Sequence, residues 1–373
     1  MASQSRAEAL SHPASRKPRS TQQQAILAAS KVWSWIFLAA LVAYFSWNGT
    51  GFFTLRNSQN ILVALVPIIL MGLGQTFVII SGGIDLSVGW VMGLASVMSA
   101  IVIRDQVNSG TNVEIAILMG FAVGIGCGLI AGLVSGTITA KLRVPPFIVT
   151  LGVSFVARGI GFLKAEGNVV GGQPVELRNL GNESLLYFVR GDEGGLYFLK
   201  KPDVIGAQLR LLDRVFTWPV VITFIIVLIG MFVLAKTQFG RHTYAIGGNK
   251  DASSRAGVPV DRHIILLYVL SAGTSALAGV LHTARFSGGA ADAGDPIMMM
   301  SIAAVVIGGV SLFGGEGRVI GTVIGAMILA VLQTGLIMIN VQTFYQYIVV
   351  GIIVIMAVLM DQARDIIIGR AEE

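Results

Sequence analysis

Long apolar runs alternate with short polar segments along most of this chain. A bilayer core requires roughly 20 apolar residues per helix, and a backbone in lipid must satisfy its own hydrogen bonds, so such runs are predicted to be helices. The pattern therefore predicts an all-α fold, a polytopic transmembrane helical bundle of about ten helices. We place the runs at 32–47, 61–81, 86–103, 113–138, 144–163, 218–236, 263–283, 297–314, 319–340 and 344–360.

Composition and charge agree with this pattern. Apolar residues make up 54% of the chain and charged residues 12%, and the net charge is +6. The basic residues lie in the polar segments and form no patch with aromatic side chains, which argues against nucleic-acid binding. Their excess in alternate segments predicts that both termini are cytoplasmic. The single cysteine, Cys127, cannot form an intrachain disulfide.

The same reading divides the chain into parts. We expect a disordered cytoplasmic tail at 1–30, a transmembrane domain at 31–362 and a cytoplasmic C-terminal tail at 363–373. Within the domain, the segment 164–217 is expected to be an insertion on the outer side of the membrane and 237–262 a cytoplasmic segment. Inside the insertion, the stretch from Val204 to Phe216 has apolar residues mostly at helical spacing.

Glycines recur every four residues in the fourth run. This spacing places them on one helix face and lets a neighbouring backbone approach closely. The residues are Gly120, Gly124, Gly128, Gly132 and Gly136. They indicate either helix packing within the chain or a dedicated dimer seam.

Asp85 stands between two apolar runs, where a carboxylate is costly unless it is paired or lines a polar cavity. It also precedes a predicted helix, where an Asp caps free backbone amides. Capping and contact with a solute are compatible interpretations. Uncharged polar residues inside or beside the runs add further candidates for a substrate pathway: Gln75, Ser87, Ser154, Gln333 and Asn340.

The cytoplasmic segment 239–259 has definite helix signals. Asn249 or Asp251 can cap a short helix through Arg255, Gly257 can end it and Pro259 prevents its continuation. A short capped helix on the cytoplasmic face is a surface that a soluble partner can bind, whereas the alternative is a solvated loop.

The sequence offers no catalytic residue and no metal site. It lacks a Gly-x4-Gly-Lys-Ser/Thr phosphate loop, a metal-ligand cluster and a nucleophile with a base at meaningful spacing. Active transport would therefore draw its energy from another polypeptide. A self-sufficient secondary transporter or channel is the alternative, with Asp85 as its only plausible coupling residue; a membrane-embedded enzyme would need clustered His, Asp or Glu.

Several motifs together resemble the ribose- and xylose-type permeases of bacterial ATP-binding cassette (ABC) sugar importers, within the branched-chain amino acid/ribose permease family. The resemblance spans about residues 31–362, and Phe344–Ile348 followed by Met360-Asp361 favours the xylose-like branch. The motifs are Gly74-Gln75 through Ile84-Asp85-Leu86-Ser87-Val88-Gly89, Val144-Pro145-Pro146-Phe147-Ile148-Val149-Thr150-Leu151-Gly152, Phe239-Gly240-Arg241 with Tyr244-Ala245-Ile246-Gly247-Gly248-Asn249, and Gly308-Gly309-Val310-Ser311-Leu312-Phe313-Gly314-Gly315.

This resemblance implies a multi-pass protein of the bacterial inner membrane that hydrolyses nothing itself. It implies two permease copies, or a pair of permeases, two cytoplasmic ATP-binding cassette subunits that bind the ATP, and a periplasmic sugar-binding protein. The solute would be a monosaccharide or polyol of the xylose, ribose, galactose or inositol class, and the insertion at 175–213 departs from the ribose permeases. The implied ATPase-docking residues are Gly240, Arg241, Tyr244, Ala245, Gly247, Asn249, Ala252 and Gly257.

Overall fold

The computed structural model describes residues 21–190, 194–202, 211–342 and 344–353, with 355, 356 and 359, and for 21–33 it describes the backbone alone. Residues 1–20 of the expected N-terminal tail and the whole expected C-terminal tail lie outside this range.

Every predicted apolar run contains a helix, and the prediction of a polytopic helical bundle is confirmed. The helices are α2 (Thr21–Asn48), α3 (Leu55–Ile80), α4 (Val88–Asn108), α5 (Val113–Lys141), α6 (Pro146–Ala165), α8 (Trp218–Lys236), α11 (Val260–Phe286), α12 (Asp295–Ile307), α13 (Val319–Met338) and an apolar helix at Phe344–Ile353. Within the described residues, seven of them, α3 to α6, α8, α11 and α13, are long and apolar enough to cross a membrane.

Several helix boundaries differ from the sequence prediction, most of all the end of α12 and the start of α2. The run 297–314 holds only the 13-residue helix α12, so the prediction of a helix over 308–314 is wrong. Gly309 adopts a φ of +79° and ends the helix, because this left-handed backbone suits glycine. At the other end of the chain, α2 begins at Thr21, inside the segment assigned to the tail.

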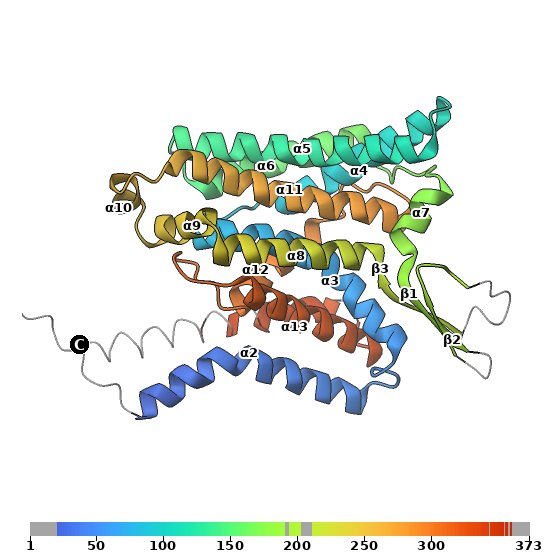
Figure 1. Ribbon diagram of the computed structural model, residues 1–373, viewed down its shortest axis with the longest axis horizontal. Helices are drawn as coiled ribbons and strands as arrows, with labels where there is room; N and C mark the ends of the chain where they lie inside the picture. Colours follow the sequence, from blue (N-terminus) through green and yellow to red (C-terminus); the bar gives the residue numbers. More distant parts are fainter. Residues whose placement is uncertain are drawn as a thin grey trace, which may run out of the picture.

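α3, α4 and α11 form the centre of the bundle, and α5, α6 and α8 expose much of their apolar surface. Figure 1 shows the short helices α9 (Gln238–Gly248) and α10 (Lys250–Arg255) at one end of the bundle. We call this the docking end. At the opposite end, the cap end, lie α7 (Val175–Asn182) and the strands β1 (Ser184–Val189), β2 (Gly195–Phe198) and β3 (Leu212–Thr217).

The five regularly spaced glycines of α5 all face neighbouring helices of the same chain. Gly120 lies against α4, Gly124 lies against both α4 and α11, and Gly128, Gly132 and Gly136 lie against α11. At each of them an added Cβ would meet backbone or side-chain atoms of that neighbour closer than any real contact. In this fold the glycines therefore serve helix packing within the chain.

The strands form a small antiparallel sheet in the order β2-β1-β3. Ser184 pairs with Thr217 and Leu186 with Val215. The helical interpretation of the Val204–Phe216 stretch is therefore wrong for residues 212–216, while 203–210 lie outside the described residues. The β-branched and aromatic residues Val215, Phe216 and Thr217 favour a strand once β1 is available as a partner.

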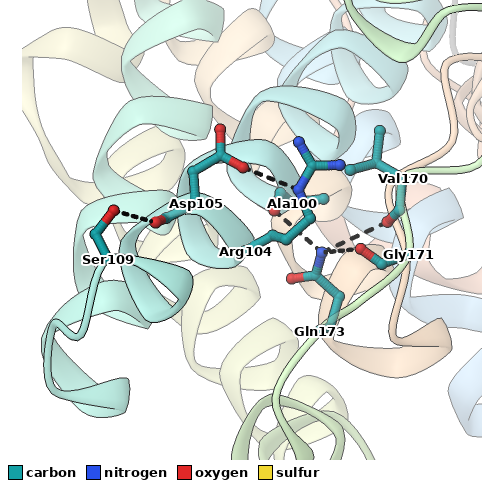
Figure 2. A network of polar contacts seen from close by, with 7 residues as sticks. All are labelled: Ala100, Arg104, Asp105, Ser109, Val170, Gly171 and Gln173. Carbon is teal, nitrogen blue, oxygen red and sulfur yellow. Dashed lines mark hydrogen bonds and ion pairs between the residues drawn. The ribbon is translucent and has the colours of Figure 1, made fainter.

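The segment before α7 is fastened to the cap end of α4, as Figure 2 shows. The amide nitrogen Nε2 of Gln173 donates to the carbonyl oxygens of Ala100, at 3.0 Å, and of Gly171, at 3.2 Å. Nearby, Arg104 forms an ion pair with Asp105 at 2.9 Å. Val170 also pairs with Gly289, in the loop between α11 and α12. The contacts of Gln173 and Val170 hold the segment before α7 against the helices.

Candidate functional site

The loop between α3 and α4 folds back into the bundle and buries Asp85, whose exposure is 1%. Its Oδ1 accepts hydrogen bonds from the backbone amide of Ser87, at 2.9 Å, and from the Ser87 hydroxyl, at 2.6 Å. Its Oδ2 accepts a hydrogen bond from the hydroxyl of Ser271 on α11, at 2.8 Å. Both carboxylate oxygens are thus occupied. Asp85 binds Ser87, the N-cap residue of α4, and joins it to α11, but its side chain bonds to none of the first amides of the helix itself.

Further bonds from three helices, α3, α6 and α11, hold the same loop and the start of α4. Gln75 of α3 donates a side-chain hydrogen bond to the carbonyl oxygen of Asp85. The backbone amide of Leu86 donates to the Thr150 hydroxyl of α6 at 3.1 Å. Ser275 of α11 donates to the carbonyl oxygen of Val88. Because α3, α6 and α11 all contact this loop, a shift of any of them changes its surroundings.

Only some of the sequence-predicted pathway residues belong to this cluster. Gln75, Asp85 and Ser87 are in direct contact through the bonds described above. Ser154 is buried one turn beyond Thr150 on α6. Gln333 of α13 lines a separate cavity towards the cap end. Asn340 is exposed just beyond α13, with a φ of +59°. The structure therefore does not bring the six residues together at one place.

The docking end contains two consecutive short helices where the sequence indicated one. Asn249 caps α10 by accepting a hydrogen bond from the amide of Ala252 at 2.8 Å, so Asn249 rather than Asp251 is the cap. Gly257 follows the helix with a φ of +84°. The additional helix, α9, begins after its N-cap Thr237, whose hydroxyl accepts a hydrogen bond from the amide of Gly240.

The residues proposed for docking divide into two groups. Gly240, Tyr244 and Gly247 point into the bundle, where Gly240 packs on the backbone of Leu234. The second group is exposed and available to a partner; it consists of Arg241, Ala245, Asn249, Ala252 and Gly257.

The inward group joins α9 to the loop after α12. The Tyr244 hydroxyl donates to the carbonyl oxygen of Gly317 at 2.6 Å. Burial raises the pKa of this phenol, with Arg318 acting in the opposite direction, so the hydroxyl keeps its proton and remains a donor. The amide of Gly315 donates to the carbonyl oxygen of Ile80 at 2.8 Å. The docking end thus contacts both the end of α3 and the loop 308–318.

Several residues of this arrangement were not found from the sequence. Ser271, Ser275 and Thr150 are small hydroxyl residues inside apolar runs, and nothing in the local pattern separates them from ordinary packing residues. Tyr268 has a buried hydroxyl without a hydrogen-bond partner among the described residues. No sequence signal distinguishes it from an ordinary packing residue either. Their positions follow from the contacts between α11, α6 and the loop.

Comparisons with known proteins agree over most of the chain. The ribose import permease protein RbsC of Escherichia coli (strain K12) is 34% identical over 332 residues, covering 89% of this chain and 94% of that protein. The ribose import permease protein RbsC of Bacillus subtilis (strain 168) is 36% identical, covering 90% and 94%. The xylose transport system permease protein XylH of Haemophilus influenzae is 35% identical, covering 88% and 95%.

The comparison with solved structures gave no significant match. The family model described as branched-chain amino acid transport system / permease component matches residues 57–358. With seven apolar helices of spanning length among the described residues, the chain is a multi-pass membrane protein. On this match and the chain-wide identity to import permeases, the chain belongs to the permease family of the branched-chain amino acid transport system type.

Proposed function

We propose that this chain is the membrane-spanning subunit of an ABC importer that carries a monosaccharide or polyol inward. The observation that carries the proposal is the similarity over about nine-tenths of the chain to permeases named for ribose, xylose and other sugars. Partner ATPase subunits would bind and hydrolyse the ATP, and a binding protein would deliver the solute.

The docking end supports the proposal that a separate ATPase subunit binds this chain. α10 is capped by Asn249 and ends before Gly257, so it presents a rigid surface with exposed residues. Behind this surface, α9 is attached to the end of α3 and to the loop 308–318. A force applied to α9 and α10 would therefore reach the helices that surround the Asp85 loop. We place this end in the cytoplasm, and we propose that two permease copies assemble with two ATPase subunits.

The Asp85 loop supports the proposal over a self-sufficient carrier. Each Asp85 oxygen already accepts a hydrogen bond from serine groups, and these contacts give the carboxylate a structural role. A carrier driven by an ion gradient would use such a carboxylate to bind the ion.

Reconstitution tests the proposal. The permease, co-expressed with the ATPase and binding protein encoded nearest to it, is placed in proteoliposomes and offered D-ribose, D-xylose, D-fructose, D-allose, D-galactose and myo-inositol. We expect uptake of at least one solute that requires both ATP and the binding protein. Uptake by the permease alone, following an ion gradient, would contradict the proposal.

A further inference from the structure

A half-open cavity of about 440 Å³ lies towards the cap end of the bundle. Its walls come from the first half of α3, the last turns of α11, the beginning of α12 and Gln333 of α13. The volume falls within the roughly 300–1,000 Å³ of small-molecule sites. Most of the wall is apolar, with residues such as Val63, Pro67 and Ile297. This cavity is separate from the Asp85 cluster.

A few polar side chains interrupt the apolar wall. They are Asn60, His282, Gln333 and Tyr347, and among the described residues none of these side chains has a hydrogen-bond partner. Polar groups on a membrane helix are costly when left without partners, so they are expected to find them in water or a ligand. An apolar pocket with a few unpartnered polar groups is the usual composition of a small-molecule site.

Most polar side chains of the cavity wall are uncharged, and no carboxylate is found among the described residues that line it. The one cation among those residues, Arg285, is turned towards α7: its guanidinium Nη1 donates to the side-chain oxygen of Asn182 at 2.6 Å, and the Asn182 amide donates to the carbonyl oxygen of Arg285 at 3.0 Å. The remaining polar groups are amides, an imidazole and a phenol, which can both donate and accept hydrogen bonds.

Aromatic surface is available beside these groups. The rings of His282 and Phe286 are in contact, with centroids 4.5 Å apart and planes tilted by 42°, and Phe286 and Tyr347 are both largely exposed. A sugar presents hydroxyls around its ring and C–H groups on its faces, so a mixture of amides and aromatic rings complements it.

We infer that this cavity is a binding site for a neutral polyhydroxyl solute, occupied when the permease receives its cargo at the cap end. The inference rests on the proposed function and adds to it the residues that the solute contacts. Asn60 and Gln333 hydrogen-bond its hydroxyls, His282 offers a further donor or acceptor, and Tyr347 lies along its rim.

Cysteine labelling tests the site in the complete transporter, with its ATPase and binding protein. Cys127→Ser removes the native thiol, and Gln333→Cys then places one thiol in the cavity. Asn108→Cys, at the exposed cap end of α4 and outside the cavity, is the matched control. Each is labelled with a membrane-impermeant methanethiosulfonate, with and without the sugar that the parent complex transports.

At a sugar concentration about ten times the dissociation constant measured for the Gln333→Cys complex itself, occupancy should slow labelling of Gln333→Cys roughly tenfold, while Asn108→Cys reacts at an unchanged rate. Labelling of Gln333→Cys that is insensitive to sugar, or that is slowed by anionic lipid instead, overturns the inference. If the parent complex transports none of the sugars, the proposed function fails; if it transports one and protection is absent, only the cavity assignment fails.

A second pair of variants tests the cavity by measuring uptake. Ala64 lines the cavity, so Ala64→Trp should fill part of it and reduce uptake at least tenfold with normal assembly. Ala122→Trp, on the exposed face of α5, should retain uptake. Equal uptake by the two variants also overturns the assignment.

Discussion

Gly247 of α9 lies directly against the carbonyl oxygen of Ile80, the last residue of α3, with no space for a side chain between them. The same oxygen accepts the hydrogen bond from Gly315. Three segments that are distant in sequence thus meet at one backbone atom, five residues before Asp85. Movement of α9 is therefore passed to α3 and to the loop 308–318 by direct contact.

Gly247→Val is expected to uncouple the transporter. Its side chain would displace α9 from Ile80, and overpacking of this kind costs about 1–3 kcal/mol. We expect ATP-driven uptake to fall at least tenfold while the ATPase still co-purifies with the permease. Gly248→Val is the matched control, because an added Cβ there has no neighbour within 4 Å. Equal uptake by both variants would contradict this role for the contact.

Tyr244→Phe removes one hydrogen bond from the same junction. The carbonyl oxygen of Gly317 loses its donor, which is worth about 0.5–1.5 kcal/mol. We expect a modest decrease in the melting temperature of the purified permease and a several-fold decrease in uptake. Tyr345→Phe, at an exposed phenol, is the comparison. An unchanged melting temperature together with unchanged uptake would show that the Tyr244 hydroxyl does not stabilise the junction.

Asp85→Asn should retain assembly and much of the uptake. The asparagine oxygen can still accept the hydrogen bonds from Ser87, and the Ser271 hydroxyl can rotate to accept one from the new amide. Asp85→Leu removes every one of these bonds and should abolish folding or uptake. Complete loss of uptake in the asparagine variant, at normal expression, would favour an ion-coupled carrier.

Gly128→Val should destabilise the bundle, since its side chain would enter the backbone of α11 near Ala272. The expected cost is about 1–3 kcal/mol, measured as a lower melting temperature in detergent. Gly126→Val, on the same helix, faces open space and should have little effect. A dimer seam along the glycine face would instead give a normal melting temperature and a loss of the dimer on size-exclusion chromatography.

The helices were predictable because membrane burial imposes long apolar runs, and the predicted centres of α3, α5 and α8 match the structure. Helix ends set by a single backbone conformation were harder. Gly308 and Gly309 end α12 inside a run that remains apolar to Phe313, so hydropathy alone does not show where the helix ends. α10 was predictable from its cap, Asn249, because capping is a local signal.

The candidate site was only partly predictable. Asp85 was found because a carboxylate is conspicuous in an apolar chain. Its partner Ser271 lies 186 positions later, and a lone serine in a helix carries no local signal of a distant contact. The strands of the cap were missed for a related reason: β3 depends on pairing with β1, and the spacing within residues 212–216 alone resembles a helix.

The cap, which consists of α7 and the strands β1 to β3, is joined to the helices by the bond of Asn182 to Arg285 and, through the segment before α7, by Gln173 to Ala100 and Val170 to Gly289. α7 also packs closely on α11, where Gly181 lies against the backbone of Ala284, whereas the strands hydrogen-bond mainly among themselves. The strands can therefore diverge during evolution, or be exchanged by protein engineering, while the docking end keeps its sequence. The one connection that touches the cavity wall, at Arg285, then becomes the position at which a new cap must remain compatible with the old bundle.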